Sequence, residues 1–142
     1  MSQPASRILL VDFYPSFRRQ SRLLLGKRSA LQIVGEASDG IEAVRQAREM
    51  KPDIILIDTG LPSLNGIEAA RRILKLNPES KIIFVSQKFS LDVVHETFAM
   101  GAMGYVLKVR AKYELLAAVD AVTAGRLFLG EGCLEYGPTR QN

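Results

Sequence analysis

Four polar residues each follow a short apolar run in this sequence, and together they could carry out one kind of chemistry. They are Asp12 after ILLV, Asp58 after IILI, Ser86 after IIFV and Lys108 after YVL. A carboxylate such as Asp58 can act as a nucleophile and become an aspartyl phosphate. Lys108 could pair with the phosphoryl group as a point charge, and the Ser86 hydroxyl could donate to one of its oxygens. Asp12 is expected to help bind Mg²⁺, which commonly uses one or two carboxylates together with phosphate oxygens.

Each of these residues also has an ordinary interpretation when taken alone. An aspartate commonly forms the turn after a strand, a serine can cap, and a lysine usually lies on the surface. The hypothesis of a site therefore depends on the four residues lying at one edge of one sheet, where two acids, a hydroxyl and a lysine have a common use.

Five buried strands are expected to position these residues. Runs of three or four consecutive apolar residues suit strands that are covered on both faces. They are predicted at residues 8–12, 32–37, 53–58, 81–86 and 104–108. Between them, residues follow the helical spacing of a core stripe, as in Phe17, Ser21 and Leu24 or in Leu115, Val119 and Val122.

The residues at the expected helix ends agree with this alternation. Asp39 with Glu42, and Asn65 with Glu68, have the spacing of a capping box. Pro15 suits a first helical turn, Gly101 and Gly125 suit left-handed positions after helices, and Pro78 follows a helix expected to end at Asn77.

The predicted fold class is therefore α/β, a doubly wound five-stranded parallel sheet of the flavodoxin-like (βα)5 type with strand order 2-1-3-4-5. In such sheets the functional groups gather at the carboxyl ends of the strands.

Composition limits the other possibilities. The chain has 142 residues, of which 47% are hydrophobic, and this suits one domain. With 19 Lys and Arg against 15 Asp and Glu the net charge is +4, and the dispersed arginines, Arg18, Arg19 and Arg22 among them, are interpreted as solvated helix faces. No apolar run approaches the ~20 residues of a membrane span. The N-terminus has no apolar signal region, and the lone Cys133 cannot form an internal disulfide, so a cytoplasmic protein that does not contact membranes is expected.

These motifs resemble the receiver domain of bacterial two-component response regulators over residues 7–125. IDTGLPSLNG is similar to the phosphoacceptor motif, which implies that Asp58 is the acceptor and that the backbone carbonyl of Gly60 is a metal ligand. FVSQ is similar to the segment that carries the switch hydroxyl, here Ser86. GYVLK is similar to the segment that carries the switch aromatic residue, Tyr105, and the lysine, Lys108.

GAMGYVLK is also similar to the LuxR/NarL-type branch of this family. The resemblance implies a sensor histidine kinase as phosphodonor, a homodimer on activation, and DNA binding only through an output domain that is absent from this chain. We expect a receiver domain at residues 1–125 and a C-terminal tail or linker at 126–142, where four glycines and prolines argue against a long helix. The chain would then be a stand-alone receiver or a fragment. Leu127, Phe128 and Leu129 would either pack back on the domain or form part of a dimer contact.

One position departs from the family pattern. Receivers usually end the first strand with an acidic pair, as in VDDH, whereas this chain has VDFY, so Phe13 replaces the acid that normally binds the metal directly. Mg²⁺ prefers oxygen ligands, so its affinity should fall unless Asp12 rotates into direct coordination. Two functions follow. In the first, a phosphoryl group on Asp58 switches a surface for partner binding or dimerisation; in the second, the chain is a phosphorylation-independent interaction module.

Other departures and other classes carry less weight. Gln87 stands where the family often has a small residue and could narrow access to Asp58, and Val109 stands where many receivers have proline. An enzyme of the haloacid dehalogenase phosphatase type would need an acid at Tyr14, so no enzyme is expected. A flavin or nucleotide binder would need a Ser/Thr/Gly-rich loop, and FYPSFRR is not one. His95 is interpreted as a partly exposed helix residue.

Overall fold

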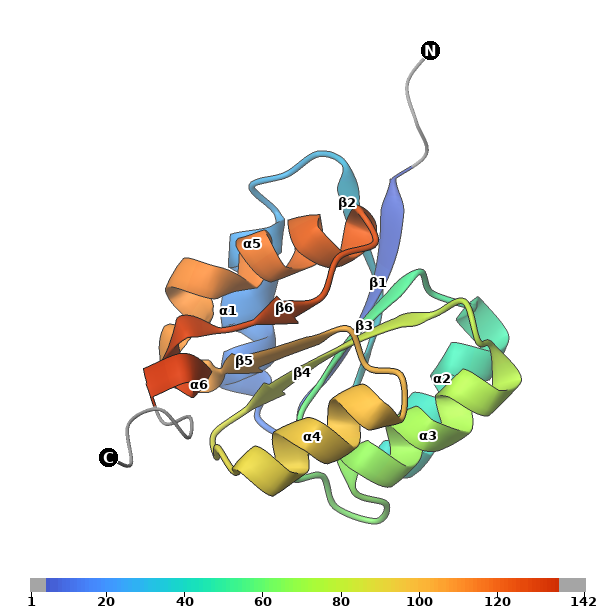
Figure 1. Cartoon of the computed structure of the whole chain (residues 1–142). Helices are drawn as coiled ribbons and strands as arrows, with labels where there is room; N and C mark the ends of the chain where they lie inside the picture. Colours follow the sequence, from blue (N-terminus) through green and yellow to red (C-terminus); the bar gives the residue numbers. More distant parts are fainter. Residues whose placement is uncertain (1–4, 136–142) are drawn as a thin grey trace.

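A computed structural model describes residues 5–135, and this part of the chain forms one parallel sheet between two layers of helices (Figure 1). The strands are β1 (Ser6–Val11), β2 (Leu31–Ala37), β3 (Ile54–Ile57), β4 (Lys81–Ser86), β5 (Gly104–Leu107) and β6 (Phe128–Leu129). The helices are α1 (Pro15–Leu25), α2 (Gly40–Met50), α3 (Gly66–Leu76), α4 (Leu91–Ala99), α5 (Ala111–Thr123) and α6 (Glu131–Glu135), with a short 3-10 turn at Lys108–Arg110.

The sheet has six strands within the described residues, in the order β2-β1-β3-β4-β5-β6. The predicted parallel α/β class and the order of the first five strands are confirmed, whereas the predicted number of five strands is wrong. The added strand, β6, pairs in parallel with β5 through Gly104 with Phe128 and Tyr105 with Leu129. Because β6 has only two residues, it has no alternating pattern that the sequence could reveal.

Side chains of each central strand enter two different cores. Leu9, Ile55 and Phe84 belong to the core under α2, α3 and α4. Ile8, Ile54 and Ile83 belong to the core under α1 and α5, on the opposite face (Figure 1). Burial on both faces explains the continuous apolar runs. The parallel pairing of the strands places their carboxyl ends at one edge of the sheet.

The predicted helix boundaries are confirmed by the capping contacts. The side chains of Asp39 and Asn65 accept hydrogen bonds from the backbone amides of Glu42 at 2.8 Å and Glu68 at 2.9 Å. Pro15 occupies the first turn of α1. Gly101 and Gly125 have φ of 114° and 80°, the left-handed region that favours glycine.

After α5, residues 128–135 fold back on the sheet, and we call this segment the C-terminal strap. The backbone amide of Gly130 donates to the Tyr105 carbonyl at 2.9 Å, and that of Glu131 donates to the Glu114 carboxylate at 2.9 Å. Phe128 is half-buried against α5, and Cys133 is only 1% exposed. The strap therefore adds both backbone pairing and side-chain packing to the edge of β5.

Of the two predicted roles for Leu127, Phe128 and Leu129, packing on the domain is found for Phe128, and a dimer contact stays a prediction. Phe128 packs back on the domain, whereas Leu127 remains 67% exposed. The predicted boundary at residue 125 stays a prediction, and the predicted tail beyond residue 135 lies outside the described residues.

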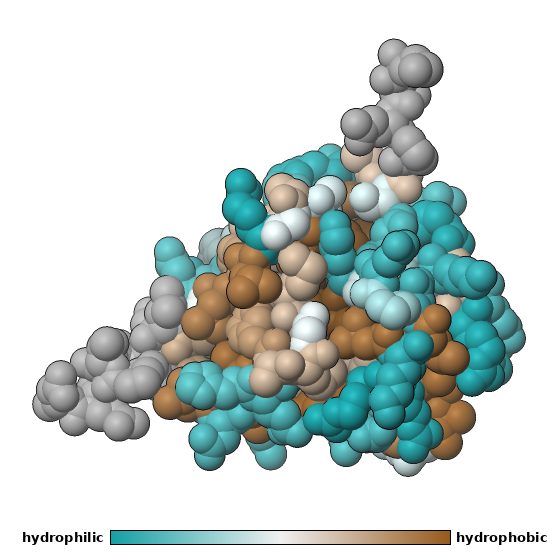
Figure 2. Space-filling model, turned by 45° about the vertical axis from the view of Figure 1, so that its right-hand side comes forward, coloured by the Kyte–Doolittle hydropathy of each residue, from teal (hydrophilic) through white to brown (hydrophobic). Residues whose placement is uncertain are grey.

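The surface is mixed in character. On the face drawn in Figure 2, apolar side chains lie between hydrophilic ones. His95 is exposed on α4, in agreement with its predicted position on a helix. Among residues 5–135, none of the helices is both long enough and apolar enough to cross a bilayer.

Candidate functional site

Asp12, Asp58 and Lys108 form a buried charged cluster at the carboxyl ends of β1, β3 and β5. Lys108 Nζ lies 2.7 Å from Asp12 Oδ2 and 2.9 Å from Asp58 Oδ2. The two acids are 4% and 7% exposed, and the lysine side chain is 9% exposed. Three of the four residues singled out by their chemistry are thus in direct contact, because parallel neighbouring strands end at the same edge.

The main chain around Asp58 is closely packed. Its amide donates to the Val11 carbonyl at 3.1 Å, and its Oδ1 accepts a hydrogen bond from the Gly60 amide at 3.1 Å. A Cβ atom built at Gly66 would lie only 1.7 Å from the Asp58 carbonyl oxygen, so the first residue of α3 must be glycine. No such restriction applies to Gly60, where an added Cβ would meet nothing within 4 Å.

Burial and ion pairing oppose one another in the cluster. Burial disfavours the charged lysine, but the contacts with Asp12 and Asp58 outweigh it, so the pKa of Lys108 lies above its usual value. Burial is also the largest influence on Asp12, and it raises the pKa of that carboxyl although Lys108 and the Tyr14 amide act to lower it. One ammonium thus faces two carboxylates, which leaves the ionised cluster with an excess of negative charge.

Ser86 and Tyr105 lie beside this cluster in a second set of hydrogen bonds. Ser86 Oγ lies 2.9 Å from Thr59 Oγ1 and accepts a hydrogen bond from the Lys88 amide at 3.2 Å. Tyr105 is 1% exposed, and its hydroxyl donates to the Lys88 carbonyl at 2.9 Å. Burial raises the pKa of Tyr105, so the hydroxyl keeps its proton. The β4–α4 loop is therefore connected to both residues.

Thr59 was not singled out from the sequence. It connects the strand that carries Asp58 to Ser86, because its hydroxyl lies within hydrogen-bond distance of the Ser86 hydroxyl. Its place directly after Asp58 in IDTG was the available signal.

Two aromatic rings, those of Tyr14 and Phe17, lie close to the Lys108 ammonium. Lys108 Nζ lies 5.1 Å from the ring centre of Tyr14 and 4.8 Å from that of Phe17, distances at which a cation is attracted to an aromatic face. Phe13 is 50% exposed, and its ring meets that of Tyr14 edge-on at 5.3 Å between centres. Phe13 therefore places an exposed apolar ring in the loop that carries Asp12.

An open groove leads to Lys108 from the surface. Its lining residues are Tyr14, Ser16, Phe17, Gln20, Gln87, Lys108 and Val109. Gln87 is exposed. Its effect on access to Asp58 stays a prediction.

The two carboxylates of Asp12 and Asp58 are suitable ligands for Mg²⁺. Within residues 5–135 no group of three or more His, Cys, Asp or Glu side chains could hold a metal ion. Asp12 and Asp58 nevertheless converge on one ammonium, and Mg²⁺ often binds through one or two carboxylates with phosphate oxygens and waters. The residues present therefore fit the ion, with fewer acidic ligands than an acidic pair at positions 12 and 13 would provide.

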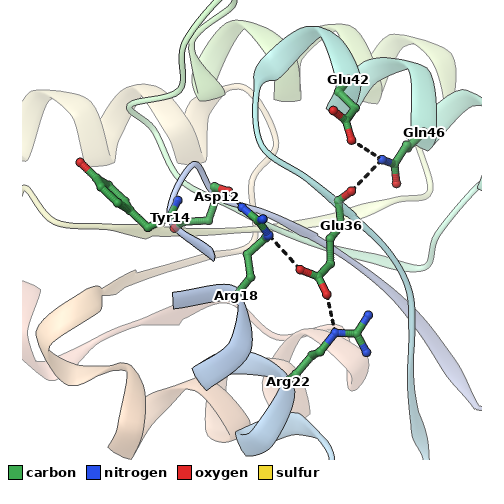
Figure 3. A network of polar contacts seen from close by, with 7 residues as sticks. All are labelled: Asp12, Tyr14, Arg18, Arg22, Glu36, Glu42 and Gln46. Carbon is green, nitrogen blue, oxygen red and sulfur yellow. Dashed lines mark hydrogen bonds and ion pairs between the residues drawn. The ribbon is translucent and has the colours of Figure 1, made fainter. Parts of the chain in front are cut away.

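Arg18 corrects the interpretation of the α1 arginines as a solvated face. Its side chain is only 16% exposed, and its Nε pairs with Glu36 Oε1 on β2 at 2.8 Å (Figure 3). Its Nη1 donates to the Asp12 carbonyl. Arg22 pairs with the other oxygen of Glu36 and is 49% exposed, and Arg19 is exposed as predicted. The sequence missed Arg18 because its partners lie on other elements.

Comparisons with known proteins agree with this geometry. The family described as response regulator receiver domain matches residues 8–120. The nitrate/nitrite response regulator protein NarL of Escherichia coli is 31% identical over 130 residues, which are 92% of this chain and 60% of NarL. The transcriptional regulatory protein LiaR of Bacillus subtilis is 34% identical over 119 residues, which are 84% of this chain and 56% of LiaR.

A solved structure gives the same result. The crystal structure of a LuxR-family two-component response regulator from Aurantimonas superposes with a TM-score of 0.87 at 35% identity, covering 92% of this chain and 94% of that one. This chain spans less than two thirds of NarL and of LiaR, which are longer proteins. The family match, the curated relatives and the solved structure place this chain in the response regulator receiver domain family, with relatives in its LuxR/NarL-type branch.

Proposed function

We propose that this receiver accepts a phosphoryl group on Asp58. The observation that carries the proposal is the Lys108 ammonium 2.9 Å from the Asp58 carboxylate, since a fixed positive charge beside the acceptor can stabilise charge on the transferring phosphoryl group. An Asp58 oxygen would form a bond to phosphorus while the bond to the donor breaks, and the donor would leave with the electron pair. A sensor histidine kinase is the class of donor that this family suggests.

Ser86 and Tyr105 are proposed to convert this event into a change of surface. A phosphoryl oxygen on Asp58 would compete with Thr59 for the Ser86 hydroxyl. Because Ser86 and Tyr105 both bond to the backbone of Lys88, a shift of Ser86 would also alter the support of the Tyr105 ring. The surface of α4, β5 and α5 would respond, and it is the proposed site of partner binding or dimerisation.

Mg²⁺ is the metal proposed for the site. Asp12, Asp58 and the backbone carbonyl of Gly60 would hold it, and the bound ion would neutralise charge between the acceptor and the phosphoryl oxygens. Phe13 supplies no oxygen, so we expect weaker binding than with an acid at this position.

The wider assignments are proposals as well. Residues 1–125 would act as a signalling module rather than an enzyme, and residues 126–142 would form a tail or linker. DNA binding would require an output domain. The phosphorylation-independent alternative is not favoured, since the buried acid–lysine cluster and the match over residues 8–120 both suit the phosphorylated function.

The direct test is incubation with acetyl phosphate, with and without Mg²⁺, followed by intact-mass measurement. We expect one phosphate-sized gain in the wild type, none in Asp58→Asn, and an unchanged gain in the control Asp92→Asn, which alters an exposed acid on α4. Phe13→Asp should reach the same gain at lower Mg²⁺. An unmodified wild type beside a modified Phe13→Asp would contradict the proposal for the native chain.

A further inference from the structure

Asp12 is held at each of its polar parts. Its backbone amide donates to the Ala37 carbonyl on β2 at 3.0 Å. Its Oδ1 accepts a hydrogen bond from the Tyr14 amide at 2.9 Å, and its backbone carbonyl accepts one from Arg18 (Figure 3). The remaining oxygen, Oδ2, contacts Lys108. The direction of this carboxylate is therefore set by a turn whose first peptide group is bound to Arg18.

The Arg18 guanidinium is held by Glu36, which is itself fixed from two sides. Gln46 Nε2 on α2 donates to the Glu36 carbonyl at 2.7 Å, and Arg22 contacts the second carboxylate oxygen. Burial acts to raise the pKa of Glu36, but the hydrogen bonds from Arg22 and Arg18 outweigh it and the pKa is lowered, so Glu36 stays ionised. A chain of contacts thus runs from α2 through β2 to the acid of the site.

We propose that Arg18 is a positioning residue for Asp12. Its guanidinium fixes the peptide group between Asp12 and Phe13, and so fixes the turn that aims the Asp12 carboxylate toward Asp58 and Lys108. A planar guanidinium can contact a carboxylate and a carbonyl at the same time, which a lysine ammonium does with less geometric control.

Phe13 makes the position of Asp12 more important for the site. The Phe13 side chain has no oxygen, so Asp12 is the only acid of its loop that can bind a metal or pair with Lys108. Small displacements of a positioned group can slow a reaction by large factors. This inference rests on the proposed function for its consequence, but its structural part can be measured without any phosphorylation.

The first experiment measures amide hydrogen exchange in the metal-free protein. Arg18→Met should speed exchange of the Tyr14 amide about tenfold, because the turn that protects it loses its support. Arg19→Met is the matched control, since Arg19 lies on the same helix and is exposed, and it should change that rate by less than about twofold. The Glu68 amide, which donates to the Asn65 side chain in the N-terminal cap of α3, should be unaffected in both variants and would reveal general loosening.

The second experiment measures the rate of phosphorylation by acetyl phosphate and the Mg²⁺ concentration that gives half of it. Arg18→Met should slow the reaction and raise that concentration, each by about tenfold, whereas Arg19→Met should stay within about twofold of the wild type. Arg18→Lys should restore part of the loss and provides a test should Arg18→Met fail to fold.

The two proposals fail in different ways. Equal effects of Arg18→Met and Arg19→Met on Tyr14 exchange and on phosphorylation would overturn the role of Arg18. An unphosphorylated wild type, together with faster Tyr14 exchange in Arg18→Met alone, would overturn phosphorylation on Asp58 and leave the positioning role supported.

Discussion

The ends of β1 and β5 meet at the Asp12–Lys108 contact, but different forces hold the two ends. Behind Asp12, the loop is held by ion pairs and side-chain contacts, with Arg18 16% exposed and Glu36 29% exposed. Behind Lys108, β5 pairs on one side with β4 and on the other with β6, and Tyr105 and Cys133 are each 1% exposed. The first end is held mainly by charge, and the second mainly by packing and backbone pairing.

This difference suggests how each end can respond to a signal. Contacts between partly exposed charges weaken with salt and depend on ionisation, so the loop after β1 should respond to cations and anions. A packed strand cannot shift without its neighbours, because protein interiors are close-packed. The end of β5 should therefore move together with the strap.

The largest loss of stability is expected from removing the buried ring of Tyr105. Tyr105→Ala should lower the free energy of unfolding by about 3 to 5 kcal/mol, because it deletes a fully buried aromatic side chain and leaves a cavity. Tyr113→Ala, at a residue that is 67% exposed, is the control and should change stability by less than about 0.5 kcal/mol. Urea unfolding measures both. Similar losses in the two variants would refute the claim that packing holds this end.

The next effect concerns Lys108, which follows β5 and contacts Asp12 at the end of β1. Lys108→Met should lower the free energy of unfolding by about 3 kcal/mol at pH 7, because two buried carboxylates lose their shared cation. The exposed Lys112 gives a matched control, and Lys112→Met should have little effect.

The loss in Lys108→Met should depend on pH in a defined direction. The pKa of Asp12 is already raised above 3.8, so this acid takes up a proton as the pH falls toward that value, and the missing cation then matters less. In the wild type, the pKa of Lys108 is raised above 10.5, so its contribution is fully present below pH 10.5 and is lost as the pH rises through the folded pKa. Urea unfolding between pH 4 and pH 11 would check both; a loss independent of pH would show that lost packing causes it.

The smallest effect is expected for local opening of the strap, which can be followed by the chemical labelling of Cys133. Burial raises the pKa of Cys133 to about 11, so a thiol reagent should label it slowly at pH 8. Glu114→Ala removes the carboxylate that accepts the Glu131 amide and should speed labelling about tenfold, the equivalent of about 1.4 kcal/mol of local opening. Glu79→Ala is the control, because Glu79 is exposed and distant from Cys133 in the sequence, and it should leave the labelling rate unchanged. Fast labelling of the wild type would mean that the strap opens independently of β5.

Much of the fold follows from local patterns in the sequence. The strands β1 to β5 are continuous apolar runs because both of their faces are buried, and Asp39, Asn65, Gly101 and Pro15 mark helix ends through contacts within a few residues. The two acids and Lys108 were also predictable, because each ends a strand of one parallel sheet.

Other features depend on residues that are distant in the sequence. Arg18 looked like a surface arginine because its own helix gives no sign of Glu36, eighteen positions away on β2. Cys133 looked like part of a tail because β6 is too short to show a period, and its burial depends on the free edge of β5.

The sequence by itself determined the order of the elements, the residue types at the strand ends and the presence of Phe13 where receivers usually have an acid. Only the tertiary structure decided that one ammonium lies between Asp12 and Asp58, that Arg18 supports the loop carrying Asp12, and that the strap covers β5. The physical reason is that propensity and periodicity act over a few residues, whereas ion pairs and strand edges are set by how distant elements pack.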